Sequence, residues 1–267
     1  VLAELGDVDE AKLLYQRAIR ICGRSSRHLY LSKLGELEVS QGNSNEAVRR
    51  FRQCVRILTE ELGETDISLA AHLLSLGRVL QSQGKYDAAK PVFKRAIEIK
   101  ERALGPQHPE VAAGLSDLAQ LAQARGDYEK AKDLLEGAVE INELALGPDH
   151  PAVADTLSSL AYVVRVQGGD AKSLLERSLK IKESGTTLQG LAMVYHDEGK
   201  LDEAKRLYER AIALLEGPRL AFALDGLAAL LSAQGNSDEA KALCDRAVDA
   251  GEEAGNPEEL AIHLNYR

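Results

Sequence analysis

Small and apolar residues recur along the chain at helical spacing, and the same arrangement returns several times. In the stretch GKYDAAKPVFKRAIEI, which begins at Gly84, an alanine follows the glycine by five residues, a phenylalanine comes four later and another alanine three beyond that. The stretches that begin at Gly126 and Gly199 have the same arrangement. Spacings of four and seven place these three side chains on one helix face. Each stretch therefore predicts a helix that packs through a small, large, small stripe.

A second helical pattern precedes each of these glycines. It is marked by leucine followed by glycine or alanine, as in Leu76-Gly77 and Leu118-Ala119. Each unit is therefore predicted to be a helix, a tight turn at the glycine and an antiparallel helix. The turn glycines are Gly6, Gly42, Gly84, Gly126, Gly168, Gly199 and Gly235.

The stretches ERALGPQHPEVA (101–112) and ELALGPDHPAVA (143–154) match at nine of twelve positions. A reaction centre is needed once, whereas a structural joint is rebuilt in every unit, so we interpret them as joints. Gly105 is predicted to end a helix in the left-handed conformation, Pro106 to prevent its continuation, and His108 to cap the next helix, which starts at Pro109. Gly147, Pro148, His150 and Pro151 have the same roles, and Asp66 and Thr186 are the expected caps in other units. Metal binding by His108 and His150 is the disfavoured alternative, because they lie one repeat apart without a third ligand.

These features together resemble the tetratricopeptide repeat, from a half unit at Val1 to Glu253. The resemblance implies an all-α, right-handed superhelical solenoid. It would be a single array over residues 1–267, with a partial repeat at 1–24, full repeats at about 26–62, 67–104, 109–146, 151–184, 186–216 and 218–254, and the start of a further helix at 257–267.

Residues 85–160 further resemble kinesin light chains, through the 42-residue period and the motif ALGPxHPxVA. Kinesin light chains typically have LNNLA in the first helix of a repeat. This chain has LLSLG, LSDLA and LSSLA at the corresponding places. The resemblance therefore does not imply cargo binding of the kinesin type.

Composition narrows the range of functions. The net charge of −9 and the pI near 5.3 argue against binding to nucleic acid or to acidic membrane surfaces. No apolar run approaches the roughly 20 residues that span a bilayer. The three cysteines are far apart, which predicts neither a disulfide framework nor a zinc site and favours a reducing, cytoplasmic compartment. The opening VLAELGD reads as the end of a helix, so we interpret the chain as part of a longer protein.

Catalytic motifs are not recognisable. GGDAKS (168–173) resembles a phosphate loop only faintly, because it lacks the first glycine and a preceding strand; we interpret it as a shortened turn. His28, His72 and His263 are expected to form no cluster. The sequence thus predicts no enzyme, no cofactor and no metal.

The resemblance implies a protein interaction scaffold or adaptor that binds partner peptide segments in a concave groove lined by the first helices. Counting i, i+3, i+7 and i+10 along those helices predicts which side chains face the groove. This count also predicts that the Leu74 side chain faces the groove. The partner-binding candidates are Arg78, Gln81, Gln120, Gln123, Tyr162, Arg165, Gln189 and His196.

Amide side chains can pair with a peptide main chain, and arginine can hold a carboxylate, so acidic partner segments are expected. One alternative is that these residues form only the solvated side of amphipathic helices. Another is that the chain is a ligand-sensing or autoinhibitory arm of a larger signalling protein, such as a nucleotide-hydrolysing switch.

Overall fold

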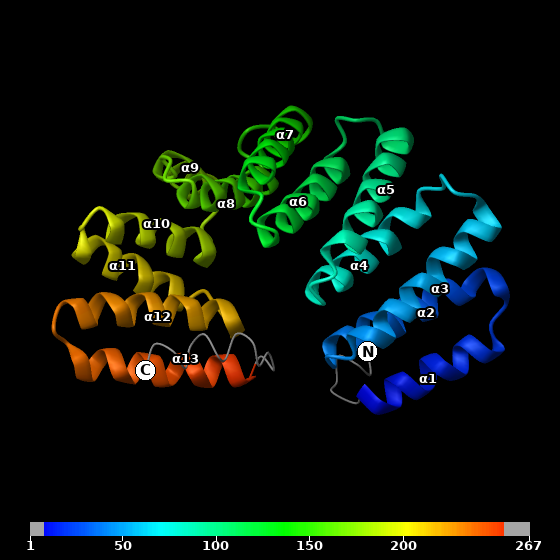
Figure 1. Cartoon of the computed structure of the whole chain (residues 1–267), viewed down its shortest axis with the longest axis horizontal. Helices are drawn as coiled ribbons and strands as arrows, with labels where there is room; N and C mark the ends of the chain where they lie inside the picture. The colour runs from blue at the N-terminus through cyan, green and yellow to red at the C-terminus, as the bar shows by residue number, and fades with distance from the viewer. Residues whose placement is uncertain (1–7, 254–267) are drawn as a thin grey trace. The chain divides into compact units, whose positions relative to one another are not determined.

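The computed structural model describes residues 8–253, apart from the side chains at positions 24, 25, 218, 252 and 253, and all regular structure in this range is α-helical (Figure 1). Residues 1–7 of the partial repeat expected at 1–24, and the further helix expected at 257–267, lie outside the described residues. The helices are α1 (Val8–Ile21), α2 (Arg24–Ser40), α3 (Ser44–Leu62), α4 (Ser68–Ser82), α5 (Tyr86–Leu104), α6 (Pro109–Ala124), α7 (Tyr128–Leu146), α8 (Pro151–Val166), α9 (Lys172–Ile181), α10 (Gly185–Asp197), α11 (Leu201–Ile212), α12 (Gly217–Ala233) and α13 (Ser237–Glu253).

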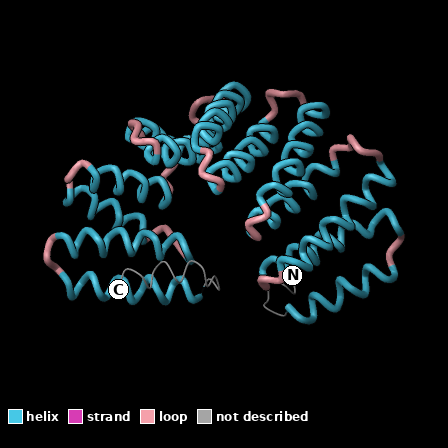
Figure 2. The backbone as a smooth tube through the Cα atoms, viewed as in Figure 1, coloured by secondary structure: helices cyan, strands magenta, loops and turns pink. Residues whose placement is uncertain are grey.

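From α2 onward the helices form six hairpins joined by short loops, as Figure 2 shows. In each hairpin the even-numbered helix is the first helix and the odd-numbered helix is the second. The chain divides into two compact units, unit 1 up to Leu146 and unit 2 from Gly147 onward, and each is described by itself. The expected single continuous array therefore stays a prediction, whereas the all-α repeat fold is confirmed.

The hairpin turns depend on glycine. Gly84 has a φ of 69° and Gly126 a φ of 76°, a region that glycine adopts at little cost. The backbone N–H of Gly84 donates to the carbonyl of Gln81, and that of Lys85 donates to the carbonyl of Leu80. This pair of bonds satisfies carbonyls at the end of α4 in the Schellman arrangement. The tight turn predicted at each described mid-unit glycine is confirmed by its positive φ.

The predicted small, large, small stripe forms the core. Ala89, Phe93 and Ala96 on α5 are all completely buried. The Phe93 ring lies directly against Gly77 on α4, where an added Cβ would come within 2.6 Å of a ring carbon. In the next hairpin the corresponding pair is Ala119 and Leu135, both also buried. Where alanine takes the place of glycine on the first helix, leucine takes the place of phenylalanine on the second helix, because the space between the two helices is fixed.

The two histidine caps are confirmed. Nδ1 of His108 accepts a hydrogen bond from the backbone N–H of Glu110 at 3.2 Å, and Nδ1 of His150 accepts from that of Ala152 at 3.1 Å. Gly105 has the expected positive φ of 89°, but its ψ of 154° is extended rather than left-handed helical. The joint therefore turns the chain away from α5 without adding a further helical residue.

Two other predicted caps were wrong in position. The N-cap of α4, the residue directly before the helix, is Ile67 rather than Asp66. The Asp66 carboxylate nevertheless accepts a hydrogen bond from the backbone N–H of Ser68 at 2.9 Å. Thr186 lies inside α10, whose N-cap is Ser184. Gly185 begins that helix without a positive φ, and a Cβ there would come within 2.6 Å of Leu215. Gly185 is thus required by close packing, which the sequence pattern alone does not distinguish from a turn.

The second helices differ in length between the units. In unit 1, α3, α5 and α7 each have 19 residues, whereas in unit 2 α9 has 10, α11 has 12 and α13 has 17. The GGDAKS stretch forms the turn before α9, where Gly168 has a φ of 76° and the Asp170 carboxylate accepts from the backbone N–H of Lys172. The stretch therefore acts as a hairpin turn like those of the other repeats.

Candidate protein interaction surface

In unit 1, α4 and α6 leave a narrow stripe exposed. On α4 the exposed positions Ala71 and Arg78 lie seven residues apart between buried leucines, and on α6 the equivalent exposed positions are Ala113 and Gln120. Seven residues are nearly two helical turns, so each pair lies on one face. We call these exposed faces of α4 and α6 the first-helix surface of unit 1.

The other predicted positions on these helices are more covered. Gln81 and Gln123 are half-buried, so they border the stripe. Leu74 was expected to face the groove, but it is only 6% exposed and belongs to the hydrophobic core of unit 1. The prediction for Leu74 was wrong because the stripe is narrower than the four-position count assumed.

Arg78 is held in place by a carboxylate from the neighbouring first helix. Its Nε donates to Oδ1 of Asp117 at 2.9 Å, and its Nη2 donates to Oδ2 at 2.8 Å. The Arg78 side chain is 58% exposed, whereas that of Asp117 is 9% exposed. The hydrogen bonds from Arg78 to Asp117 raise the pKa of the guanidinium. The pair thus orients the arginine on the surface and compensates its charge.

Unit 2 has a different first-helix surface, formed by the exposed faces of α8, α10 and α12. Tyr162 on α8 occupies the repeat position of Arg78 and Gln120 and is 48% exposed. Arg165 lies one turn further along α8, and its Nη1 donates to Oδ2 of Asp197 at 3.3 Å. The Arg165 side chain is 26% exposed, so it is less accessible than Arg78.

The α10 candidates lie at the edge of this surface. Gln189 and His196 are both half-buried. Near the C-terminal end of α10, the ammonium groups of Lys172 on α9 and of Lys200, just after α10, lie 4.6 and 5.4 Å from the ring centroid of Tyr195. Glu198 forms ion pairs with both lysines, so this end of unit 2 is a compact charged cluster.

Sequence reasoning missed the carboxylates that bind the two predicted arginines. Asp117 and Asp197 stand on the next first helix, 39 and 32 residues downstream of their partners. Acidic residues in such pairs can be buried: Asp117 is 7% exposed, and Glu38, which pairs with Lys12, is 1% exposed. No local motif marks such pairs, because they depend on how neighbouring hairpins stack.

The histidines give a further correction. His28 on α2 and His72 on α4 were expected not to cluster, but their ring centroids lie 5.8 Å apart in an edge-to-face arrangement. Burial of His72 and the proximity of His28 lower the pKa of His72, and Glu36 opposes the shift. Within residues 8–253, no group of three or more His, Cys, Asp or Glu side chains is arranged to hold a metal ion. His263 lies outside the described residues.

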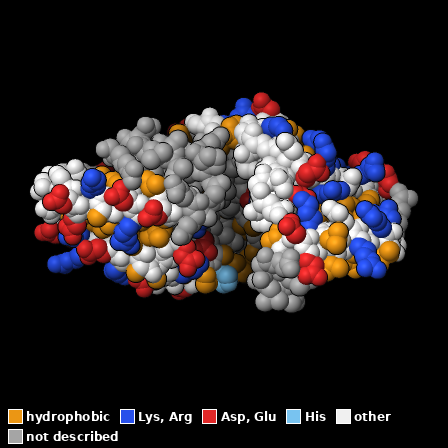
Figure 3. Space-filling view, turned by 90° about the horizontal axis from the view of Figure 1, so that it is seen from below, with side chains coloured by type: hydrophobic (Ala, Val, Ile, Leu, Met, Phe, Trp, Pro, Cys, Tyr) orange, Lys and Arg blue, Asp and Glu red, His pale blue; other side chains and the backbone are white. Residues whose placement is uncertain are grey.

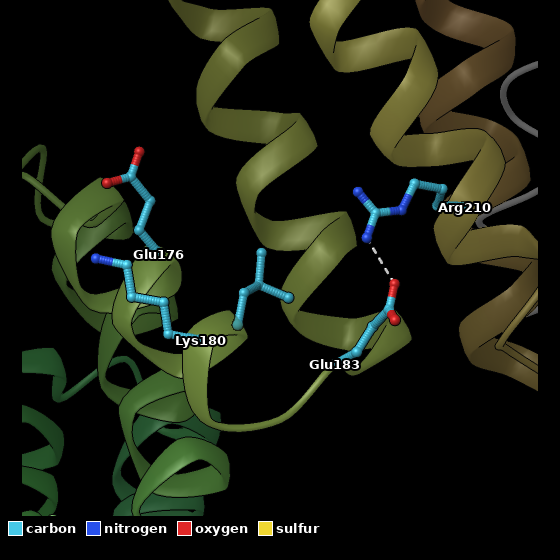
Figure 4. A pocket seen from close by; sticks show the side chains of 5 residues that line it. Glu176, Lys180, Glu183 and Arg210 are labelled. Carbon is cyan, nitrogen blue, oxygen red and sulfur yellow. Dashed lines mark hydrogen bonds and ion pairs between the residues drawn. The ribbon is translucent and has the colours of Figure 1, made fainter. Parts of the chain in front are cut away.

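A depression of about 370 Å³ lies beside the shortened α9 (Figure 4). Its lining includes Glu176 and Lys180 from α9, Leu179 between them, and Arg210 of α11, whose Nη2 donates to Glu183 at 2.6 Å. Small-molecule sites are mainly apolar in lining. Four of the five residues that line this depression are charged, so we attribute it to the early end of α9 rather than to a ligand site.

Surface charge is distributed unevenly between the units. Residues 1–146 contain 22 acidic and 20 basic side chains, whereas residues 147–267 contain 20 acidic and 13 basic ones. On the face drawn in Figure 3, side chains of both signs are interspersed and apolar side chains show as small areas between them. Across the described helices, none combines the length and hydropathy that a membrane span needs.

The repeat geometry defines an all-α protein of stacked helical hairpins, and comparison with known families identifies its family. Models of the tetratricopeptide repeat match residues 25–102, 68–143 and 110–184, and a second model of that repeat matches 185–216 and 221–254. These matches cover more than half of the chain. The chain therefore belongs to the tetratricopeptide repeat family, as its sequence motifs indicated.

Solved structures of other repeat proteins have the same fold. A tetratricopeptide repeat protein from Parabacteroides merdae matches with a TM-score of 0.69 at 17% identity, covering 98% of this chain and 94% of that chain. BtubC (BKLC) from P. vanneervenii matches with a TM-score of 0.60 at 20% identity, covering 82% and 92%. The repeats of a putative kinesin light chain from Podosopora anserina match with a TM-score of 0.47 at 24% identity, covering 85% and 96%. Among curated proteins, none matches the chain.

Proposed function

We propose that this chain is a protein interaction scaffold that binds extended peptide segments along its first helices. The family supports a scaffold role, because repeats of this type generally mediate protein interactions and are typically non-catalytic. The observation that supports the site is the exposed stripe on neighbouring first helices, at positions that the core leaves free. The alternative role as a sensing or autoinhibitory arm stays a prediction, since no described residue bears on it.

In unit 1 we assign binding of the peptide main chain to Arg78 and Gln120. Asp117 takes up two donors of Arg78, and among the described residues none accepts from its Nη1. That nitrogen is available to a peptide carbonyl. The Gln120 amide, exposed one turn beyond Asp117, supplies both a donor and an acceptor.

The charge of the Arg78 pair favours neutral acceptors. Because Asp117 already compensates the guanidinium, an incoming carboxylate gains less at Arg78 than it would at an unpaired arginine. A neutral main-chain carbonyl can accept a hydrogen bond from Arg78 even though Asp117 compensates the charge of the guanidinium. The acidic partner segment expected from the sequence therefore stays a prediction, and main-chain recognition is the function that we propose for unit 1.

A random peptide library displayed on phage, selected against the full chain, tests this proposal. Gln120→Glu removes a donor and adds a negative charge, so the selected peptides that use unit 1 should bind about tenfold more weakly, or about 1.4 kcal/mol. The matched control is Gln53→Glu, the same change at an exposed position of the second helix α3. Failure to select any peptide, or equal weakening by both variants, would contradict the proposal.

A further inference from the structure

Exposed aromatic side chains occur on the first helices of unit 2. Of the Phe and Tyr side chains that the structure describes, the exposed ones are Tyr162 on α8, at 48%, and Phe222 on α12, at 43%. By contrast, Phe51, Phe93 and Tyr208 are at most 2% exposed, at the large position of the core stripe. The other described tyrosines are half-buried, so the most exposed aromatic side chains of the described residues both lie on first helices of unit 2.

Tyr162 has apolar neighbours on the same surface. Val166 follows by four residues on the same face of α8 and is 39% exposed. Met193 occupies the Tyr162 position on α10, which packs beside α8, and is half-buried. We call Tyr162, Val166 and Met193 the Tyr162 patch.

Core packing does not require an apolar residue at the Tyr162 position. The same repeat position holds Arg78 in α4 and Gln120 in α6, and both of those hairpins form the same buried stripe. An exposed tyrosine and valine therefore contribute little to the stability of α8. Exposed apolar side chains that gather on one face mark interaction sites, and tyrosine is enriched among the residues that dominate binding.

The charge of unit 2 indicates what kind of segment fits this patch. Unit 2 has seven more acidic than basic residues, and the cation nearest the patch on α8, Arg165, is paired with Asp197. The net negative charge of unit 2 favours basic segments over acidic ones.

We propose that the Tyr162 patch binds a large apolar side chain of a basic peptide segment. This inference rests on the proposed function, because it assigns a partner chemistry to the first-helix surface of unit 2. The apolar side chain lies against Tyr162 and Val166 and extends toward Met193 on α10. Lysine or arginine residues beside it in the segment are favoured by the net negative charge of unit 2.

The phage-displayed library provides the test, with the full chain as target. Peptides that bind unit 2 should combine a large apolar residue with a net positive charge. Tyr162→Ala should weaken them about tenfold, and Tyr162→Phe should retain binding because the apolar ring remains. Leu214→Ala is the matched control, since Leu214 is 54% exposed in unit 2 but lies beyond the end of α11.

A charge pair at Val166 tests the electrostatic part. Val166→Lys should weaken the selected peptides more than Val166→Glu does, and the difference should shrink between about 50 mM and about 500 mM NaCl because salt screens exposed charges. Circular dichroism should show that all variants keep the parent helical signal. Selection of acidic peptides, or of peptides insensitive to Tyr162→Ala, would overturn this inference and leave the proposed function intact. If no peptide is selected at all, the proposed function itself fails.

Discussion

Units 1 and 2 use the same packing between helices but differ in what surrounds it. Ala131 and Leu135 in unit 1 and Ala171 and Leu175 in unit 2 are all buried, at 0 to 3% exposure. Ala131 and Leu135 lie in α7, which has 19 residues, whereas Leu175 lies in α9, which has 10, and Ala171 directly precedes α9. The comparison shows that the stripe within the first turns of a second helix suffices to form a hairpin, and that the remaining turns can vary.

The first-helix surfaces differ more than the cores. At one repeat position the chain has Arg78, Gln120, Tyr162 and Met193 in successive hairpins, which are a cation, an amide, an aromatic and a thioether. Arg78, Gln120 and Tyr162 are exposed, whereas Met193 packs partly against the core of unit 2. Positions that packing leaves free are those at which partner recognition can differ between units, so unit 1 and unit 2 are expected to recognise different segments.

The largest effect is expected from a charge placed in the core of either unit. Ala131→Glu and Ala171→Glu each bury a carboxylate without a partner, which should lower the free energy of unfolding by several kcal/mol. Since repeats depend mainly on their neighbours, hydrogen exchange should rise first in α6 and α7 for the former variant and in α8 and α9 for the latter. An equal loss of protection in both units for both variants would show that the units are not independent in stability.

An intermediate effect is expected from Gly77→Ala. The new Cβ would come within 2.6 Å of the Phe93 ring, so the variant should lose about 1 to 3 kcal/mol in denaturant unfolding. Adding Phe93→Leu reproduces the Ala119 and Leu135 pair and should recover part of that loss, giving a favourable coupling between the two changes.

Gly137→Ala is the control for this pair. An added Cβ at Gly137 on α7 has no neighbour within 4 Å, so this substitution should be neutral or slightly stabilising through helix propensity. Simple additivity of Gly77→Ala and Phe93→Leu would contradict the exchange of size between the two helices.

The smallest effect concerns His72, in unit 1 only. Its pKa is lowered in the folded state, mainly by burial, so the unfolded chain binds the proton more readily. Stability from this group is present above the unfolded pKa of about 6.5 and is lost as pH falls below it. His72→Gln should flatten this acid-side decrease in a urea midpoint measured from about pH 8 to about pH 5. An unchanged pH profile would contradict this role of His72.

The fold was predictable from the sequence because its determinants are local. The alanine stripe, the turn glycines and the capping histidines each act within a few residues, so Ala89, Gly84 and His108 could be assigned correctly. Thr186 failed as a cap because Gly185 has a packing role, which depends on Leu215 some thirty residues away.

The candidate surface was predictable in outline only. Helical periodicity identified exposed Arg78, Gln120 and Tyr162. It could not reveal that Asp117 binds Arg78 or that His28 contacts His72, because these contacts depend on the offset between neighbouring hairpins. That offset is a property of packing between helices, and no single helix encodes it.

The central claim is that partners bind the first helices, and hydrogen exchange of the full chain with a selected peptide tests it most directly. For a basic, apolar peptide, slower exchange is expected in α8 and α10, with α9 and α11 unchanged, because only the first-helix surface would be covered. Tyr162→Ala at the same peptide concentration should remove this protection. Protection confined to the second helices α9 and α11 would contradict the account, since the peptide would then bind on the face opposite to the one that we propose.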